Sequence, residues 1–320
     1  FPPRRSSDLN FRNNLGQALI AFGFDGIVYA AQNRAKVINC SWGGSGYSLY
    51  AQDVINFATR LGSLVVCAAG NNNSQEIFYP SGYNNVLAVG STTVSDVKSG
   101  FSNFGTYIDV MSPGSDIYNT WQNNTYATLS GTSMSSPIAA GLAALVFARF
   151  PNLTPVQVKE RIRVTSDDIY SLNSGTFAGL LGKGRINAQR AVTETNLISA
   201  RITETIFSDV GTGDGDGIFE PNELINVGIR VTSILGPTTN LSLTLQSRTT
   251  SATVVNGNYT PGTIALNDTA NNFASRFTFR ISATVAQNAD LRFQIIFADG
   301  SYSDRSEEHT SELQSRHNLG

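Results

Sequence analysis

One serine has a position that suits nucleophilic chemistry. Ser133 lies in the run Ser130–Pro137, and the following residues to Phe147 are small or aliphatic, as in a buried helix. A serine at such a helix start is close to free backbone N–H groups and to the positive end of the helix dipole. Gly131 would let a substrate backbone approach closely. The alternative for a serine at this position is a helix N-cap without a chemical role.

Carboxylates gather in a second stretch, Gly213–Glu223. Calcium takes six to eight oxygen ligands, many of them carboxylates. The spacing differs from that of an EF-hand loop, because glycine stands where further ligands are expected. Asp/Gly turns also connect strands without a metal. Calcium binding and a metal-free turn therefore both remain open, and the candidate ligands are Asp214, Asp216, Glu220 and Glu223.

Alternating helices and strands surround Ser133. Apolar strands between helices indicate a parallel sheet covered on both faces, so the predicted fold is a doubly wound α/β domain. Thr154, Pro155 and Gln157 have the types and spacing of a helix start with a capping box. The predicted helices span 16–32, 50–61, 133–147 and 154–164, and the predicted strands span 37–40, 64–69, 86–90 and 107–111.

The pattern changes after Val192, where helical periodicity stops. Short strands with alternating side chains and turn residues between them are typical of a β-sandwich. We therefore expect an all-β Ig-like sandwich after the α/β domain, with the boundary near residue 197. The predicted strands span 224–231, 241–245, 277–281 and 291–297.

Both ends of the chain resemble translated DNA-sequencing adapters, at Pro3–Leu9 and from Arg305 onward. The alternative is that they are ordinary polar tails. We exclude residues 1–9 and 305–320 from the fold prediction, which leaves domains at 10–196 and 197–304. Both histidines, His309 and His317, lie in the excluded part. The remainder is expected to be part of a longer protein, cut on both sides.

Composition excludes some classes of partner. Charged residues make up 14% of the chain and the net charge is -2, so nothing predicts a nucleic-acid partner. No apolar run reaches the roughly 18 residues of a membrane helix. A surface rich in Asn and Thr suits a secreted or cell-surface protein. Cys40 and Cys67 lie in apolar runs and are expected to be buried and free, or disulfide-bonded if their strands are adjacent. No feature indicates an oligomeric state.

Several ordered segments resemble the subtilisin-like serine peptidases, or subtilases, over roughly residues 16–192. In chain order, they resemble the family's substrate-binding strand, oxyanion-hole segment, stretch before the nucleophile, nucleophile motif and domain end. In the same order, the segments are Val37–Gly44, Val65–Asn71, Phe101–Gly105 with Val110–Gly114, Ser130–Pro137 and Gly182–Asn187.

The resemblance implies an endopeptidase with a polypeptide substrate and no cofactor for the chemistry. Ser133 would be the nucleophile, and Asn71 would donate to the oxyanion. The alternative for Asn71 is a plain turn residue. Trp42 and Gly43 would suit large side chains. Two segments would flank the pocket for the residue before the scissile bond and present main-chain groups to an extended peptide, namely Ser41, Trp42 and Gly43, and Ala68, Ala69 and Gly70.

The chain departs from the family at the catalytic acid and base. Subtilases use the order Asp, His, Ser, and both missing motifs should precede Gly16. Asp25 matches a surface position of the family and not the acid. Without a base the chain by itself is expected to be inactive. It is also expected to fold poorly and expose apolar surface, because the missing segment should carry a helix that packs beside 133–147.

Rival interpretations are a peptide-binding pseudopeptidase, an adhesion module and an esterase. The pseudopeptidase would follow if the upstream sequence lacks Asp or His. In the adhesin the β-sandwich, which resembles accessory domains of secreted bacterial peptidases, would carry the function. An α/β-hydrolase esterase needs Gly-x-Ser-x-Gly, but Gly131 and Ser135 flank Ser133, so the motif fails.

Overall fold

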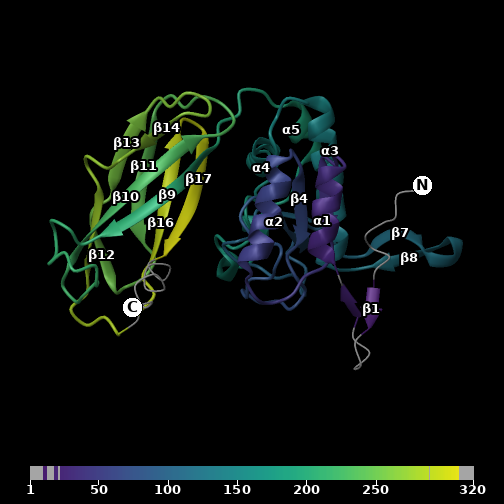
Figure 1. Ribbon diagram of the computed structural model, residues 1–320, viewed down its shortest axis with the longest axis horizontal. Helices are drawn as coiled ribbons and strands as arrows, with labels where there is room; N and C mark the ends of the chain where they lie inside the picture. The colour runs from purple at the N-terminus through teal and green to yellow at the C-terminus, as the bar shows by residue number, and fades with distance from the viewer. Residues whose placement is uncertain (1–9, 13–17, 21, 288, 310–320) are drawn as a thin grey trace. The chain divides into compact units, whose positions relative to one another are not determined.

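The computed structural model describes residues 10–12, 18–20, 22–287 and 289–309, which divide into two compact units between Thr195 and Asn196 (Figure 1). The adapter-like residues 1–9 and 310–320 lie outside the described residues. No helix within the described ranges is long and apolar enough to cross a membrane.

A four-stranded parallel sheet forms the centre of the first unit. All residues of its inner strands β4 and β5 are buried, as expected for parallel strands that are covered on both faces. In register, Cys40 of β3 is paired with Cys67 of β4, and both cysteines are free and buried. The strand order is β3 (Val37–Cys40), β4 (Leu64–Ala68), β5 (Val86–Thr92) and β6 (Val110–Pro113).

Helices cover both faces of this sheet, which confirms the predicted α/β architecture. Val65 and Cys67 of β4 pack in one core cluster with the first two helices, α1 (Gly23–Gln32) and α2 (Leu49–Arg60). The alternate residues Leu64 and Val66 pack in another cluster with the later helices. Those later helices are α3 (Thr132–Arg149), α4 (Pro155–Val164) and α5 (Ala188–Thr193).

The start of α4 has the predicted capping box. The Thr154 hydroxyl accepts a hydrogen bond from the backbone N–H of Gln157 at 3.3 Å. In return the Gln157 side chain accepts one from the backbone N–H of Thr154 at 3.0 Å. Two of the unpaired N–H groups at the helix start are thereby satisfied.

The predicted start of the first helix at residue 16 is wrong. The helix begins at Gly23, because Phe22 has a left-handed backbone with a φ of 61° and interrupts the helical path. Before it, β1 (Asn10–Arg12) and β2 (Ala18–Ile20) pair antiparallel. The strand predicted at 107–111 is also displaced, since β6 begins only at Val110.

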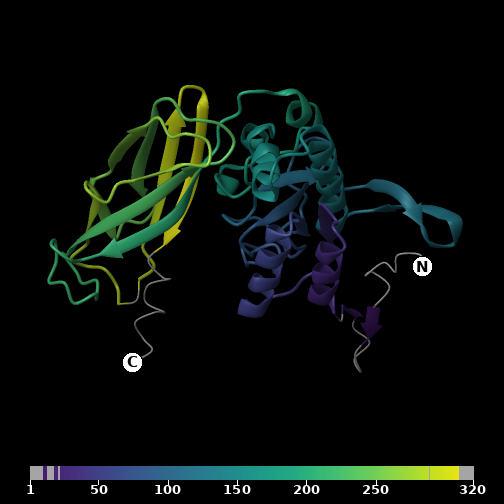
Figure 2. The same ribbon diagram turned by 45° about the horizontal axis from the view of Figure 1, so that its top comes forward.

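A two-stranded hairpin, which the sequence pattern did not predict, precedes α3. It consists of β7 (Ile117–Trp121) and β8 (Thr125–Leu129), and it projects from the sheet of the first unit in both views (Figures 1 and 2). Tyr118 and Tyr126 are exposed and stack on its surface, with 5.3 Å between ring centroids.

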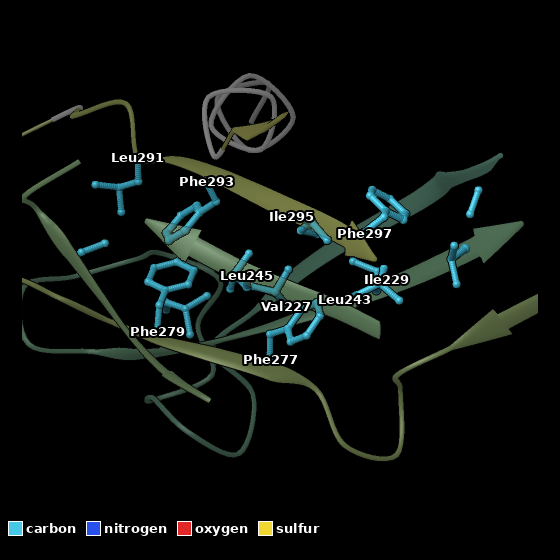
Figure 3. Packing of buried hydrophobic residues seen from close by; sticks show 14 of the residues in the cluster. Val227, Ile229, Leu243, Leu245, Phe277, Phe279, Leu291, Phe293, Ile295 and Phe297 are labelled. Atoms are coloured by element: carbon cyan, nitrogen blue, oxygen red, sulfur yellow. The ribbon is translucent and has the colours of Figure 1, made fainter. Parts of the chain in front are cut away.

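The second unit consists of two antiparallel sheets that share one apolar core. Phe279 of β15 and Phe293 of β16 meet there with 4.3 Å between ring centroids (Figure 3). One sheet contains β9 (Ala200–Ser208), β10 (Leu224–Ser233), β12 (Ala252–Asn256), β14 (Thr269–Asn271) and β15 (Phe277–Ile281), and the other contains β11 (Leu241–Ser247), β13 (Asn258–Gly262), β16 (Arg292–Asp299) and β17 (Tyr302–His309).

The last strand continues beyond the predicted domain end at residue 304. Residues 305–309 of β17 pair with β16, from Arg305 opposite Ile296 to His309 opposite Arg292. The range excluded as adapter-like therefore overlaps the end of a strand.

Candidate active site

Ser133 is the second residue of α3 and is joined to the end of β3 by two hydrogen bonds. Its hydroxyl donates to the backbone oxygen of Ser41 at 3.3 Å. The hydroxyl of Ser41 donates to the backbone oxygen of Ser133 at 2.9 Å. The serine at the helix start is thereby placed against one of the two segments expected to bind substrate.

A further polar chain, which sequence reasoning missed, supports this junction. The Ser136 hydroxyl donates to the side-chain oxygen of Asn39 at 2.6 Å. The Asn39 amide nitrogen then donates to the Ser41 hydroxyl at 2.9 Å. Asn39 thus links the first turn of α3 to the residue that contacts Ser133.

The carboxamide of Asn71 has its oxygen turned toward Thr132. That oxygen accepts from the backbone N–H of Thr132 at 2.9 Å and from its hydroxyl at 2.8 Å. The amide nitrogen faces the turn before Ser133, since it would lie 3.7 Å from a Cβ built on Gly131. An amide donor therefore lies near Gly131, at the start of the helix that carries Ser133.

Asn103, which the sequence analysis did not single out, holds the loop that carries Asn71. Its backbone N–H donates to Gly70 at 3.0 Å, and its side-chain oxygen accepts from the N–H groups of Asn72 at 2.8 Å and Ser74 at 3.3 Å. Gly70 has a φ of 101°, and a Cβ there would lie 2.5 Å from the Asn103 amide nitrogen. Only glycine fits this close approach.

The buried Lys98 holds the other end of this loop. Its ammonium donates to the Asn73 side chain at 2.8 Å and to the backbone oxygens of Ser99 and Ser102 at 3.0 Å. Burial lowers the pKa of Lys98. These bonds tie the segment after Asn71 to the segment that contains Asn103.

A pocket of about 590 Å³ brings most of the predicted site residues together. Ala69 is the exception, because it is fully buried and its backbone groups bond Val89 and the Tyr107 hydroxyl. The pocket lining includes the predicted residues Ser41, Trp42, Gly43, Ala68, Gly70, Asn71 and Ser133.

Residues 12–191, more than half of the chain, match the model of the subtilase family. The chain belongs to the subtilase family. At 44% identity over 169 residues it is similar to a thermophilic serine proteinase of Bacillus sp. (strain AK1), and the match covers 53% of this chain and 40% of that protein. It is also 43% identical over 168 residues to thermitase of Thermoactinomyces vulgaris, covering 52% of this chain and 58% of thermitase.

This subtilase chain therefore spans about half the length of these curated relatives. Among solved structures, a prenylagaramide maturation protease matches with a TM-score of 0.51 at 24% identity, over 55% of this chain and 68% of that one. This likeness concerns the fold alone. The residues that match the family model, 12–191, lie in the first unit.

The pocket of the subtilase unit offers no general base among the described residues that line it. Their side chains include neither histidine nor carboxylate. In the described part of the chain the one histidine is His309, at the end of β17. A base and the acid that orients it are therefore not assembled with Ser133 by these residues.

The acidic loop in the second unit of this subtilase chain brings together a different set from the predicted one. The set consists of the predicted Asp214 and Asp216 together with Asp209, and one carboxylate oxygen from each lies within 4.8 Å of the others. The Glu223 carboxylate instead accepts from the backbone N–H groups of Asp214 and Glu220, at 3.3 and 2.9 Å. Asp209 was missed because it lies before the Asp/Gly run.

Proposed function

We propose that this chain carries the nucleophile and the oxyanion hole of a serine endopeptidase. The observation that carries the proposal is the orientation of Asn71, whose oxygen is held by Thr132 while its amide nitrogen faces the turn before Ser133. The extended substrate would lie between the segments of Ser41 and Ala68. Polypeptides are the proposed substrates.

In the proposed reaction the Ser133 hydroxyl attacks the carbonyl carbon of the scissile bond. A proton leaves to a general base as the C–O bond forms, and the carbonyl oxygen becomes an oxyanion. The Asn71 amide and the backbone N–H of Ser133 stabilise that charge, and one such donor is worth about 3–4 kcal/mol. The base then gives this proton to the leaving nitrogen, the C–N bond breaks and the amine departs. The acyl-enzyme left on Ser133 is hydrolysed by water. None of these steps uses a cofactor.

The base and its orienting acid are proposed to come from residues outside this sequence. The only histidines are His309 and His317, and the pocket lining contains none. Without the base only residual catalysis remains. The chain alone is therefore proposed to be inactive, and its longer parent active.

The lack of a histidine in the pocket lining also favours a second candidate, a pseudopeptidase that only binds peptide. The same pocket would then hold an extended chain without cleaving it. Ser133 and Asn71 would retain only their hydrogen bonds to Ser41 and Thr132.

The deciding experiment is to recover the parent gene upstream of Asn10 and express the longer protein. Peptide hydrolysis and covalent labelling by a fluorophosphonate are then compared with the Ser133→Ala variant. Hydrolysis and labelling that both vanish in the variant support the peptidase. An intact upstream domain without Asp or His, and no Ser133-dependent hydrolysis, would leave the peptide-binding candidate.

The second unit is proposed to be an Ig-like β-sandwich accessory domain. Its two antiparallel sheets with one shared core support this proposal. The domain limits near residue 197 and the secreted or cell-surface location remain proposals. They rest on composition and on the change of pattern after Val192.

Calcium is proposed for the acidic loop, with Asp209 added to the ligand set. Three carboxylates within 4.8 Å suit a hard divalent cation, and backbone carbonyls would have to supply most remaining ligands. Calorimetric titration of residues 196–309 with calcium should show heat of binding. The Asp214→Asn variant should bind calcium more weakly. The exposed acid Glu204, outside the loop, serves as control in Glu204→Gln. An absence of calcium-dependent heat would refute the site.

A further inference from the structure

We infer that Phe78 closes the pocket for the residue before the scissile bond, so that the enzyme cleaves after small residues. The inference rests on the proposed function, because it assigns that pocket to the space between the segments of Ser41–Gly43 and Ala68–Gly70. It names the class of substrate within the polypeptides: chains with alanine, serine or glycine at this position.

The ring of Phe78 lies between the two segments that would bind substrate. A Cβ built on Gly43 would lie 2.4 Å from the ring carbon Cε1 of Phe78. A Cβ built on Gly70 would lie 3.0 Å from Cγ of the same ring. The ring thus reaches the backbone on both sides of the gap. Phe78 lines the pocket and is only half-buried, so its ring forms part of the pocket wall and not of the core.

The backbone that carries this ring is anchored. Next to Phe78, Tyr79 exchanges two hydrogen bonds with Gly44, each at 2.8 Å. The backbone oxygen of Phe78 accepts from the Ser81 hydroxyl and, at 3.0 Å, from the N–H of Gly82. Withdrawal of the segment would break these bonds, so they hold the backbone of Phe78 in place beside the gap.

A substrate side chain that enters between the two segments therefore meets the ring face or edge. An alanine side chain ends at Cβ, and a serine side chain extends one heavy atom further. Either side chain would remain beside the two glycines. A phenyl or long aliphatic group would occupy the space of the Phe78 ring. The expectation from Trp42 and Gly43, a pocket for large side chains, did not include Phe78, which is 35 residues further along the chain.

The test uses the longer protein with its own upstream sequence. Two peptides that differ only in alanine or phenylalanine before the scissile bond are compared by kcat/KM. We expect kcat/KM for the alanine peptide to exceed that for the phenylalanine peptide by at least about tenfold, the smallest discrimination expected when a side chain does not fit its pocket. In Phe78→Gly the phenylalanine peptide should gain by at least about tenfold relative to the alanine peptide. Tyr50→Ala, an exposed aromatic residue on α2 outside the pocket lining, is the matched control and should leave the ratio unchanged.

The outcomes separate the inference from the function on which it rests. Cleavage that depends on Ser133 but favours the phenylalanine peptide overturns the inference and leaves the peptidase intact. Cleavage that persists in Ser133→Ala, or no cleavage by the longer protein, overturns the proposed function and the inference with it. If Phe78→Gly does not fold, the wild-type ratio and Phe78→Val decide, since valine also shortens the side chain that fills the gap.

Discussion

The carboxamide of Asn71 can serve an oxyanion in only one of its two orientations. Its nitrogen donates and its oxygen accepts, so the oxygen must turn away from the reacting carbonyl. Both donors of Thr132, the N–H and the hydroxyl, bind that oxygen and select this orientation. Thr132 is therefore a positioning residue for the proposed oxyanion donor.

In the longer protein, Asn71→Ala should lower kcat by about 10²–10³-fold with little change in KM, because the donor acts in the transition state. Thr132→Val should lower kcat by about tenfold, since it removes the hydroxyl that donates to Asn71 and accepts from the Gly70 N–H, while the backbone N–H of Thr132 still donates to Asn71. Steady-state kinetics on one peptide measure both. A higher KM with unchanged kcat would contradict the assignment.

Asp299 offers a pH test in the second unit. Burial alone would raise its pKa, but hydrogen bonds from the N–H and hydroxyl of Thr239 and the N–H of Asn240 outweigh burial and hold the pKa below the ordinary 3.8. A carboxyl with a lowered folded-state pKa gives stability that is complete above its unfolded pKa and is lost as pH falls through the folded value.

Asp299→Asn should therefore cost residues 196–309 about 2 kcal/mol of unfolding free energy at pH 7, where the charged acceptor is lost. The difference from wild type should shrink as pH falls below 3.8, the ordinary pKa of the carboxyl. Urea denaturation of both proteins, from pH 7 to below pH 3.8, measures the difference in unfolding free energy. A difference that stays constant with pH would show that the charge of Asp299 does not matter.

The sequence predicts some residues of the site better than others. Ser133 and Asn71 stand in contiguous motifs, so resemblance to a family finds them. Asn103 also stands in a motif, Phe101–Gly105, but its role, like that of Phe78, lies in contacts with residues more than 30 positions away, such as Asn72 and Gly43. No local pattern encodes such contacts, and only the folded chain brings them to the site.

At the scale of elements, local signals located helix starts where the side chains make the cap. Thr154 and Gln157 bond each other's backbone, so their spacing alone predicted the start of α4. The start of α1 depends instead on the left-handed Phe22, an unusual conformation that apolar periodicity does not encode. The strands of the second unit were only partly predicted, because missed strands such as β9 and β13 carry few buried residues.

The outward face of α3 is apolar although it is exposed. Ile138 is 38% and Leu145 56% exposed, and Pro137 and Ala144 lie on the same side of the helix. β3 beside it is an edge strand of the sheet. This surface supports the expectation that a further segment packs here in the longer protein.

We therefore expect Leu145→Lys to be tolerated by this chain alone but to destabilise the longer protein by about 2–4 kcal/mol, because a charge would then be buried without a partner. The chain alone should bind a hydrophobic dye, and the variant less. Chemical denaturation and dye fluorescence measure these effects. Equal tolerance of the variant in both proteins would show that nothing covers this face.

At the scale of the whole molecule, each unit has its own apolar core, and the cores share no residue. Residues 196–309 should therefore unfold in one cooperative transition when expressed alone. Ending the fragment at residue 304 removes the partners of residues 292–296 in β16 and should lower the transition temperature. Circular dichroism during heating compares the two fragments. Identical transitions would indicate that the end of β17 contributes nothing.

The reactivity of the two cysteines in the central sheet measures how often the first unit opens. Both are at most 1% exposed, and burial together with the neighbouring Cys40 raises the pKa of Cys67 well above its ordinary value. A thiol reagent can react with them only while the first unit opens and exposes the core cluster that they share with α1 and α2. The chain contains no other cysteine. The rate of alkylation therefore reports how often the first unit opens, without any label and without interference from the second.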